Sequence, residues 1–350
     1  MRIVHLERTD DDGTRACHET SVAARAADDP LNPPQSLATF TGWLRVGWDA
    51  NPNDAWYVPG PADDSDAVID TETETATGYA AVAWYRLDLP DLENRERAHL
   101  NLVVHPAHRR RGIGRELLRH AAAQAAAHGR SVLSSSGMPG TPGEEFARAM
   151  GFSFGLFEPR RMLDLRTVPA GQFARLRAEA SQKAAGYTLI RWTGPVPQQH
   201  YGSVAGVFNA MNDAPSDAGR EDDLWDAKRV RDRADAALEA TGYRAYTVAA
   251  VHDASAEMAA LTMVFVQPES PDWGDQGITG VTRPHRGHRL GLLTKAAMLE
   301  WLAEAEPKLE RIITENADSN SYMISINETL GYRLAPPGRQ FYQRPVADIR

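Results

Sequence analysis

The sequence predicts an α/β chain of two domains that share one plan, and three observations support this prediction. The chain has 350 residues, which is long enough for two full-sized cores, and it is 42% hydrophobic and 24% charged. Short apolar stretches of strand type are interspersed with longer stretches of helical spacing. The order of these stretches occurs twice, so we assign residues 1–166 to a first domain, 167–186 to a partly helical linker and 187–350 to a second domain.

The first half begins with a strand at residues 2–7, followed by a helical region. The next expected elements, in chain order, are the strands GYAAVAWYRLDLP (78–90) and AHLNLVVHP (98–106), a helix over 114–128, the strand RSVLSSS (130–136), the helical EEFARAMGF (144–152) and a last strand that ends at Leu165.

The second half repeats this order from residue 187. The expected elements are the strand YTLIRW (187–192), helical stretches in 204–212 and 224–240, the strands YRAYTVAAVH (243–252) and AALTMVFV (259–266), a strand at 278–281, a helix over 291–306, the strand LERIITENA (309–317) and the helical MISINETLGYR (323–333).

Residues 105–118 read HPAHRRRGIGRELL and join a predicted strand to a predicted helix. The first amide groups of a helix have no acceptor within the helix, and the helix dipole places about half a positive charge there, so this end attracts anions. Gly112 and Gly114 let the backbone approach a phosphate group, and Arg109 to Arg111 add positive charge. The sequence therefore favours a phosphate-binding loop, with an ordinary basic loop and glycine hinge as the alternative.

Matching motifs mark corresponding points of the two halves. HPAHRRRGIG (105–114) in the first half corresponds to RPHRGHRLG (283–291) in the second. AMGF (149–152) corresponds to TLGY (329–332), after a comparable interval. Agreement at both ends of the interval indicates an internal repeat rather than coincidence.

Composition limits the classes of function. The formal net charge of −9 argues against general nucleic-acid binding and suits capture of cationic small molecules. Cys17 is the only cysteine, which excludes an internal disulfide and a cysteine-based metal cluster, and we expect no metal. The first residues, MRIVHLERTDDD, lack the apolar core of a signal peptide, and no run of about 18 apolar residues occurs. We expect a cytoplasmic monomer or homodimer that binds neither nucleic acid nor membrane.

These motifs resemble those of the GCN5-related N-acetyltransferase (GNAT) superfamily. Its signature, between the fourth strand and the third helix, is an arginine or glutamine, two residues, a glycine, one residue, then a glycine or alanine. Arg109, Gly112 and Gly114 match it fully. The whole chain is similar to the tandem two-domain type found in actinobacteria, to which mycothiol synthase also belongs. The resemblance implies two GNAT-like domains, each with a central twisted mixed β-sheet flanked by helices.

The second half departs from this signature. When it is aligned on Arg286 and Gly291, the first glycine position is occupied by Arg289. This side chain would either obstruct a pyrophosphate or bind it through its guanidinium group. A retained but altered site and a purely structural domain both remain open.

The resemblance implies acetyl-CoA or another acyl-CoA as co-substrate, with its pyrophosphate on the loop amides and its pantetheine arm beside the end of the preceding strand. The residues implied in the first half are Leu102, Val103, Val104, Arg109, Arg110, Arg111, Gly112, Ile113, Gly114 and Arg115. Those implied in the second half are Val281, Arg286, Gly287, His288, Arg289, Leu290, Gly291, Asn316 and Asn320.

Acyl transfer to an amine needs a base to deprotonate the amine and an acid to protonate the departing thiolate. Family members often use a glutamate on the fourth strand and a tyrosine four residues before the final glycine. Neither is plainly present, because the tyrosine positions hold Ala147 and Asn327. The candidate catalytic residues are His99, Glu315 and Tyr322. A packing or surface role is the alternative for each, and catalysis by positioning alone is also feasible.

The acceptor site is expected in the loop after the first helical stretch of a domain. In the second half this loop reads NDAPSDAGREDDLWD, and the candidate substrate-binding residues are Asp213, Asp217, Glu221 and Asp222. Carboxylates suit an amine-bearing molecule such as a polyamine or an aminoglycoside, and an exposed acidic loop is the alternative. Residues 62–78 are expected to form a mobile hairpin or loop extension.

The sequence therefore predicts an acyl-CoA-dependent N-acyltransferase that acts on a small amine by direct attack on the thioester. One alternative is a tandem GNAT protein that has lost its chemistry and binds CoA or another small molecule. Another alternative is transfer to protein lysines or N-termini.

Overall fold

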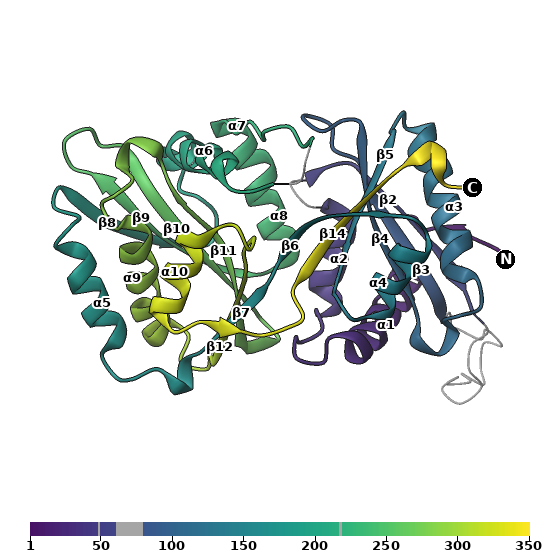
Figure 1. Ribbon diagram of the computed structural model, residues 1–350, viewed down its shortest axis with the longest axis horizontal. Coiled ribbons are helices and arrows are strands. Elements are labelled where there is room, and N and C mark those ends of the chain that lie inside the picture. Colours follow the sequence, from purple (N-terminus) through teal and green to yellow (C-terminus); the bar gives the residue numbers. More distant parts are fainter. Residues whose placement is uncertain (48–49, 61–79, 217–218) are drawn as a thin grey trace. The chain divides into compact units, whose positions relative to one another are not determined.

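The computed structural model describes residues 1–47, 50–60, 80–216 and 219–350, and these divide into two compact units. The first unit comprises Met1–Gly155 and Phe341–Arg350, and the second comprises Leu156–Gln340. Each contains one seven-stranded mixed sheet with helices on its faces (Figure 1). The expected fold class is confirmed. The expected hairpin at 62–78 lies outside the described residues.

The first sheet has the strand order β1-β2-β3-β4-β5-β14-β6. Its strands are β1 (Val4–His5), β2 (Asn53–Pro59), β3 (Ala81–Asp88), β4 (Arg97–Val104), β5 (Val132–Gly137), β6 (Ser153–Glu158) and β14 (Arg339–Pro345). β4 and β5 are parallel, whereas β1 to β4 pair antiparallel in succession. One core cluster packs α1 (Asp11–Asp28) and α2 (Leu37–Val46) on one face, and another packs α3 (Ile113–Ala127) and α4 (Pro142–Ala149) on the other.

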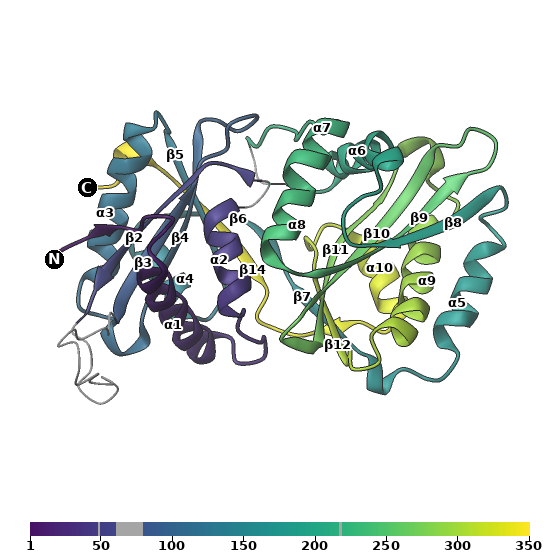
Figure 2. The ribbon, with the colours of Figure 1, turned by 180° about the vertical axis from the view of Figure 1, so that it is seen from behind.

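The second sheet has the strand order β13-β7-β12-β11-β10-β9-β8. Its strands are β7 (Arg160–Asp164), β8 (Tyr187–Thr193), β9 (Arg244–His252), β10 (Met258–Gln267), β11 (Ser270–Val281), β12 (Arg311–Glu315) and β13 (Arg333–Leu334). One core cluster joins this sheet to α5 (Gln172–Ser181), α9 (Leu290–Ala305) and α10 (Ser321–Leu330) (Figure 2). A second cluster joins it to α6 (Tyr201–Asn209) and to the helical segment made of α7 (Ala227–Arg229), the π-helical turn Val230–Asp235 and α8 (Ala236–Thr241).

The two halves exchange a strand. β7 comes from the first half of the chain and pairs with β12 in the second sheet, whereas β14, at the end of the chain, lies between β5 and β6 of the first sheet (Figure 1). β14 lies beside β5, which is parallel to β4, and β7 lies beside β12, which is parallel to β11. The two inserted strands therefore hold equivalent places in their sheets. The two units consequently divide at Gly155/Leu156 and again at Gln340/Phe341, whereas the sequence predicted one linker at 167–186.

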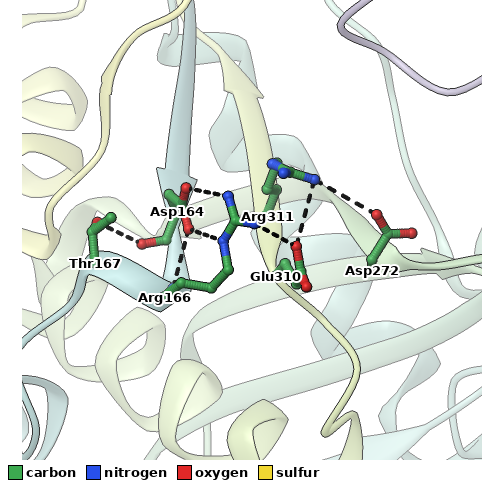
Figure 3. Close-up of polar contacts among 6 residues, drawn as sticks. All are labelled: Asp164, Arg166, Thr167, Asp272, Glu310 and Arg311. Carbon is green, nitrogen blue, oxygen red and sulfur yellow. Dashed lines mark hydrogen bonds and ion pairs between the residues drawn. The ribbon is translucent and has the colours of Figure 1, made fainter.

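Side chains at the end of β7 fix this strand to its new neighbours (Figure 3). Arg166 donates to both carboxylate oxygens of Asp164, at 2.8 and 2.7 Å, and to Glu310 at 2.8 Å. Arg311 lies 3.7 Å from Glu310 and 3.6 Å from Asp272 in β11. Charges from three strands therefore meet where β7 enters the second sheet.

Candidate functional site

The arginine-glycine loop of the first unit has the backbone of an anion-binding turn. β4 ends at Val104, Arg110 and Gly112 have φ angles of 64° and 82°, and α3 begins at Ile113. Among the described residues, none accepts a hydrogen bond from the amides of residues 110–114. These amides lie at a helix N-terminus, where the dipole favours an anion.

The two glycines of this loop serve different needs. Gly112 is left-handed, and a Cβ atom there would meet nothing within 4 Å, so the space above it is open. Gly114 has an ordinary φ, but a Cβ atom there would lie 3.2 Å from the ring of Phe146 and 3.7 Å from Val104. Gly112 therefore serves the turn and the approach of a ligand, and Gly114 lets α4 pack closely on the start of α3.

Arg109 is held by protein groups. Its Nε donates to the carbonyl oxygen of Val104 at 3.2 Å, and its two terminal nitrogens donate to the two oxygens of Asp28, each at 2.7 Å. Such a two-point pair between guanidinium and carboxylate is strong and directional. Arg109 thus fixes the loop to the end of α1, and Arg110 and Arg111 are the exposed arginines of the run.

The second unit repeats this loop, including its departure from the signature. Gly287 and Arg289 are left-handed, with φ angles of 89° and 57°, as Arg110 and Gly112 are in the first unit. α9 begins at the next residue, Leu290. Holding a side chain in this conformation costs about 1–2 kcal/mol. Each loop therefore holds one arginine in this conformation, Arg110 in the first and Arg289 in the second, and the Arg289 side chain is exposed.

The contacts around the second loop are equivalent as well. A Cβ atom on Gly291 would lie 3.2 Å from Ile326 of α10 and 3.9 Å from Val281. Arg286 donates from Nε to the carbonyl oxygen of Val281 at 3.2 Å and from Nη2 to Asp213 at 2.5 Å. The pair of Arg286 and Asp213 repeats the pair of Arg109 and Asp28.

The expected acceptor residues have different surroundings. Asp213 binds Arg283 as well as Arg286, and these two guanidinium groups hold the pKa of its carboxyl far below the usual range. Both of its oxygens are thus engaged in fixing the loop. Glu221 and Asp222 are exposed, and Asp217 lies outside the described residues. Their role in binding an acceptor stays a prediction.

Each sheet opens along one edge of its central strand. β4 pairs with β5 only as far as Leu100 opposite Ser135, so the expected residues Leu102, Val103 and Val104 lie beyond this pairing. β11 pairs with β12 as far as Asp275 opposite Ile313 and continues to Val281. In both units the open stretch ends at the arginine-glycine loop. A backbone edge of this kind can form hydrogen bonds with the amide groups of an extended ligand.

The two central strands differ in one detail. β3 and β4 pair without interruption from Ala83 opposite Val104 to Asp88 opposite His99. In the second unit the pairing of β10 with β11 shifts between Thr262 opposite Thr279 and Val264 opposite Gln276. Two residues of β11, Gly277 and Ile278, thus face the single residue Met263. This is a β-bulge, which leaves one strand residue outside the regular ladder.

Two polar pairs join α9 and α10 to neighbouring segments of the second unit. Lys295 donates to Gln276 at 2.9 Å and lies over the ring of Tyr332 at 5.2 Å from its centroid. Asn327 donates to Asn316 at 2.7 Å. Within the described part of the chain, Oδ1 of Asn327 and the hydroxyl of Tyr332 have no hydrogen-bond partner, and both residues are fully buried.

The three candidate catalytic residues have different surroundings. His99 is half-buried on β4, and its Nδ1 lies 3.4 Å from the hydroxyl of Ser134. Its neighbours Ala98 and Leu100 face α3 and α4, so His99 lies on the opposite face of the sheet. Glu315 ends β12 and forms an ion pair with Arg339. Tyr322 lies in the first turn of α10 and is 58% exposed. Asn320 caps the same helix, because its side chain accepts from the amide of Met323 at 3.3 Å.

Comparisons with known proteins agree with this geometry. Residues 66–153 match a family model described as an acetyltransferase (GNAT) domain. Over 99% of this chain and 98% of the other, the structure is similar to a tandem GNAT protein from the clavulanic acid biosynthesis pathway, at 28% identity and a TM-score of 0.75. The chain has the tandem GNAT fold. Its further likeness to mycothiol synthase stays a prediction.

More distant structures share this fold. A GCN5-related N-acetyltransferase from Sphaerobacter thermophilus is 15% identical, with 99% of this chain and 95% of the other covered and a TM-score of 0.63. A search of curated proteins finds no match.

The residues present fit an acyl-CoA in the first unit, and the second unit repeats the free loop amides and the open strand edge. Free loop amides would meet the pyrophosphate, open space lies above Gly112, and the open strand edge leads away from the loop. Among the described residues, no group of three histidine, cysteine or acidic side chains is arranged to hold a metal ion. None of the described helices has the length and apolar character needed to cross a bilayer.

The sequence alone did not indicate the contacts of several residues in and around the site. Asp28 is 81 positions from Arg109, so nothing in the local sequence connects them. Lys295 could have been found, because it interrupts the apolar helix LGLLTKAAMLEWL. Tyr342 of β14 lies against Gly137 at the end of β5, where a Cβ atom would come within 3.2 Å of its ring, and only the strand exchange brings it there.

Proposed function

We propose that this tandem GNAT protein transfers an acyl group, expected to be acetyl, from acyl-CoA to an amine of a small molecule. The observation that carries this proposal is the joint presence of a helix-start loop with free amides and an open strand edge that ends at it. The loop suits a pyrophosphate, and the edge suits the amide-bearing pantetheine arm. Acyl-CoA supplies an activated thioester carbonyl, and the protein must orient the amine and manage the protons.

The reaction balances without a further reagent. The amine nitrogen forms a bond to the thioester carbonyl carbon, the carbon–sulfur bond breaks, and the sulfur leaves with its electron pair. The proton lost by the amine is equivalent to the one the thiolate gains, so the products are an amide and free CoA. We propose His99 for deprotonation in the first unit, and Glu315 and Tyr322 as base and acid in the second.

The acceptor is proposed to be a small, positively charged amine. Support comes from the net charge of −9 and from the exposed Glu221 and Asp222. The similar tandem GNAT protein belongs to a biosynthetic pathway for a small molecule, clavulanic acid, which also favours a small acceptor. Acetyl-CoA is a cytoplasmic metabolite, so we place the reaction in the cytoplasm.

A second candidate function is binding of CoA without transfer. Ala147 and Asn327 stand where family members often have a tyrosine acid, and Tyr322 is largely exposed. A protein of this kind would hold acetyl-CoA without releasing CoA when amines are added. Transfer to protein amino groups is a further alternative, and acetylation of a protein rather than of any small amine would support it.

Calorimetric titration of acetyl-CoA tests the binding half of the proposal. Gly112→Glu and Gly291→Glu each place bulk and negative charge in one loop. Gly129→Glu and Gly242→Glu are matched controls, because these glycines are also left-handed, with φ of 71° and 68°, and have open space around them at helix C-termini. We expect binding by the wild type and by both controls, and loss of at least one site in a loop variant. A folded wild type that does not bind acetyl-CoA would contradict the proposed function.

A further inference from the structure

Lys295 is buried in a place where the fold does not require a lysine. It lies in the middle of α9, is 2% exposed, and is surrounded by the apolar core of the second unit. Burial of an ammonium group is unfavourable unless the group is well paired. Burial lowers the pKa of Lys295 to about 7, so the neutral form of its amine is populated near physiological pH. A residue with this energetic disadvantage calls for a reason other than packing.

The only described hydrogen bond of the Lys295 amine leads to Gln276 on β11. Nζ donates to Oε1 of Gln276 at 2.9 Å. Gln276 in turn donates from Nε2 to the carbonyl oxygen of Met263, at 2.6 Å, and to the hydroxyl of Thr262, at 3.1 Å. Met263 is the residue that faces the bulge of β11. Lys295 therefore orients the amide that spans the irregular part of the strand pair.

This bulge lies at the point where β11 leaves β12. The last residue of β11 that pairs with β12 is Asp275, and the bulged residues Gly277 and Ile278 follow shortly after it. A bulge frees one residue from the ladder, so a strand amide there can turn toward the open edge. That edge is the one proposed for the pantetheine arm, which ends in the thioester. An amide aimed at the thioester oxygen would stabilise the negative charge that develops during attack.

In the first unit, apolar residues fill the positions that correspond to Gln276 and Lys295, so the fold can be packed without a polar pair there. Leu118 follows Arg109 by nine positions, as Lys295 follows Arg286, and it is 2% exposed. Leu100 lies three positions after Arg97, where β4 begins to pair with β5, and it is 3% exposed. Gln276 lies three positions after Trp273, where β11 begins to pair with β12, so Leu100 and Gln276 are equivalent. The pair of leucines thus replaces the pair of Gln276 and Lys295, and the strand beside it has no bulge.

We propose that Lys295 is a positioning residue for acyl transfer: through Gln276 it holds the β11 bulge so that a strand amide faces the acyl carbonyl, and the second unit therefore carries out the reaction. This inference rests on the proposed function. Lys295 itself does not touch the acyl group. It acts through Gln276, and the transferred proton does not pass through it.

The test replaces the polar pair by an apolar pair. Gln276→Leu/Lys295→Met is made in a Gly112→Glu background, which closes the first loop, and Leu118→Met in that background is the matched control. Acetyl-CoA carrying ¹³C at the thioester carbonyl is the probe, with spermidine as the amine. The readouts are the infrared carbonyl band of the bound thioester, the Kd of acetyl-CoA, and the kcat of CoA release.

We expect the double variant to remain folded and to bind acetyl-CoA within about threefold of its background, while kcat falls by about 100-fold, the effect of losing one oxyanion donor. The carbonyl band should move back toward its position in free acetyl-CoA. Unchanged kcat and an unchanged band would overturn the inference. If the double variant does not fold, the single Lys295→Met variant, which keeps the side-chain length, is measured in the same way.

The failure of this inference differs from failure of the proposed function. If the wild type releases CoA but the Gly112→Glu variant does not, transfer takes place in the first unit. This result would overturn the inference about Lys295 and leave the proposed function standing. A wild type that releases no CoA with any amine would overturn both.

Discussion

Asp28 accepts two hydrogen bonds from Arg109, each 2.7 Å long, and so joins the end of α1 to the phosphate-binding loop. In the second unit Asp213 accepts one hydrogen bond from Arg286, at 2.5 Å, and is also bound by Arg283. The first residue of the signature therefore acts through its side chain as an anchor for the loop, while the loop amides remain free for a ligand.

We expect Asp28→Asn to weaken acetyl-CoA binding by the first loop by about tenfold, because loss of a charge-assisted pair loosens the loop. The free energy of unfolding should fall by about 1–2 kcal/mol. Calorimetry in a Gly291→Glu background and urea unfolding measure the two effects. Asp12→Asn, an exposed carboxylate in the first turn of the same helix, is the control. Equal effects of the two substitutions would show that Asp28 contributes only general charge.

Arg289→Gly separates backbone strain from ligand binding in the second loop. Removal of a side chain from the left-handed position should raise the free energy of unfolding by about 0.5–1 kcal/mol. If the guanidinium group binds the pyrophosphate, as the retained loop shape favours, the same substitution weakens acetyl-CoA binding severalfold in a Gly112→Glu background. Tighter binding after Arg289→Gly would instead identify Arg289 as an obstruction.

The pH dependence of stability should reveal the buried amine of Lys295. Its pKa falls from 10.5 to about 7 on folding, so between these values the unfolded chain binds more protons than the folded one. This group therefore makes the wild type more stable as pH rises above 7, by up to about 1.4 kcal/mol per pH unit.

Guanidinium unfolding at pH 7, 8 and 9 tests this dependence. In Lys295→Met that rise is absent, so the stability of the variant relative to the wild type should decline steadily over this range. Lys308→Met, which replaces an exposed lysine, should follow the wild type at every pH. Parallel curves for Lys295→Met and the wild type would contradict the assignment of a buried, neutral lysine.

Tyr342 tests the contribution of the exchanged strand β14 to the first unit. Burial raises the pKa of its phenol to about 12, and its hydroxyl has no hydrogen-bond partner among the described residues. Tyr342→Phe should therefore change the free energy of unfolding by less than about 1 kcal/mol. Tyr342→Ala should lower it by about 3–5 kcal/mol, because it leaves a cavity beside Gly137. A large loss in Tyr342→Phe, measured by urea unfolding, would reveal a polar role of the hydroxyl.

Local patterns in the sequence predicted the parts of the fold that depend on local interactions. The helix start after Gly112, the strand before it and the matching loop at Arg286 all follow from glycine conformation and apolar spacing, and the structure confirms them. The first part of β11 escaped prediction because Pro271, Asp272 and Gly274 are typical of turns.

Features that depend on distant pairing could not be predicted. The pattern of a strand indicates that it will pair but not with which sheet, so the exchange of β7 and β14 leaves no local signal. The expected acidic site around Asp213 depended on charge alone, and the structure engages this carboxylate with Arg283 and Arg286. Lys295 carried a usable signal, since a lone lysine on an apolar helix face is unfavourable without a partner.

Amine-dependent release of CoA from acetyl-CoA tests the central claim most directly. The wild type is mixed with acetyl-CoA and either spermidine or kanamycin, and the free thiol is followed with time. We expect at least one amine to raise the release above the rate without amine, and a protein carrying both Gly112→Glu and Gly291→Glu to lose this increase. A wild type that binds acetyl-CoA but releases no additional CoA with any amine would contradict transfer to a small amine.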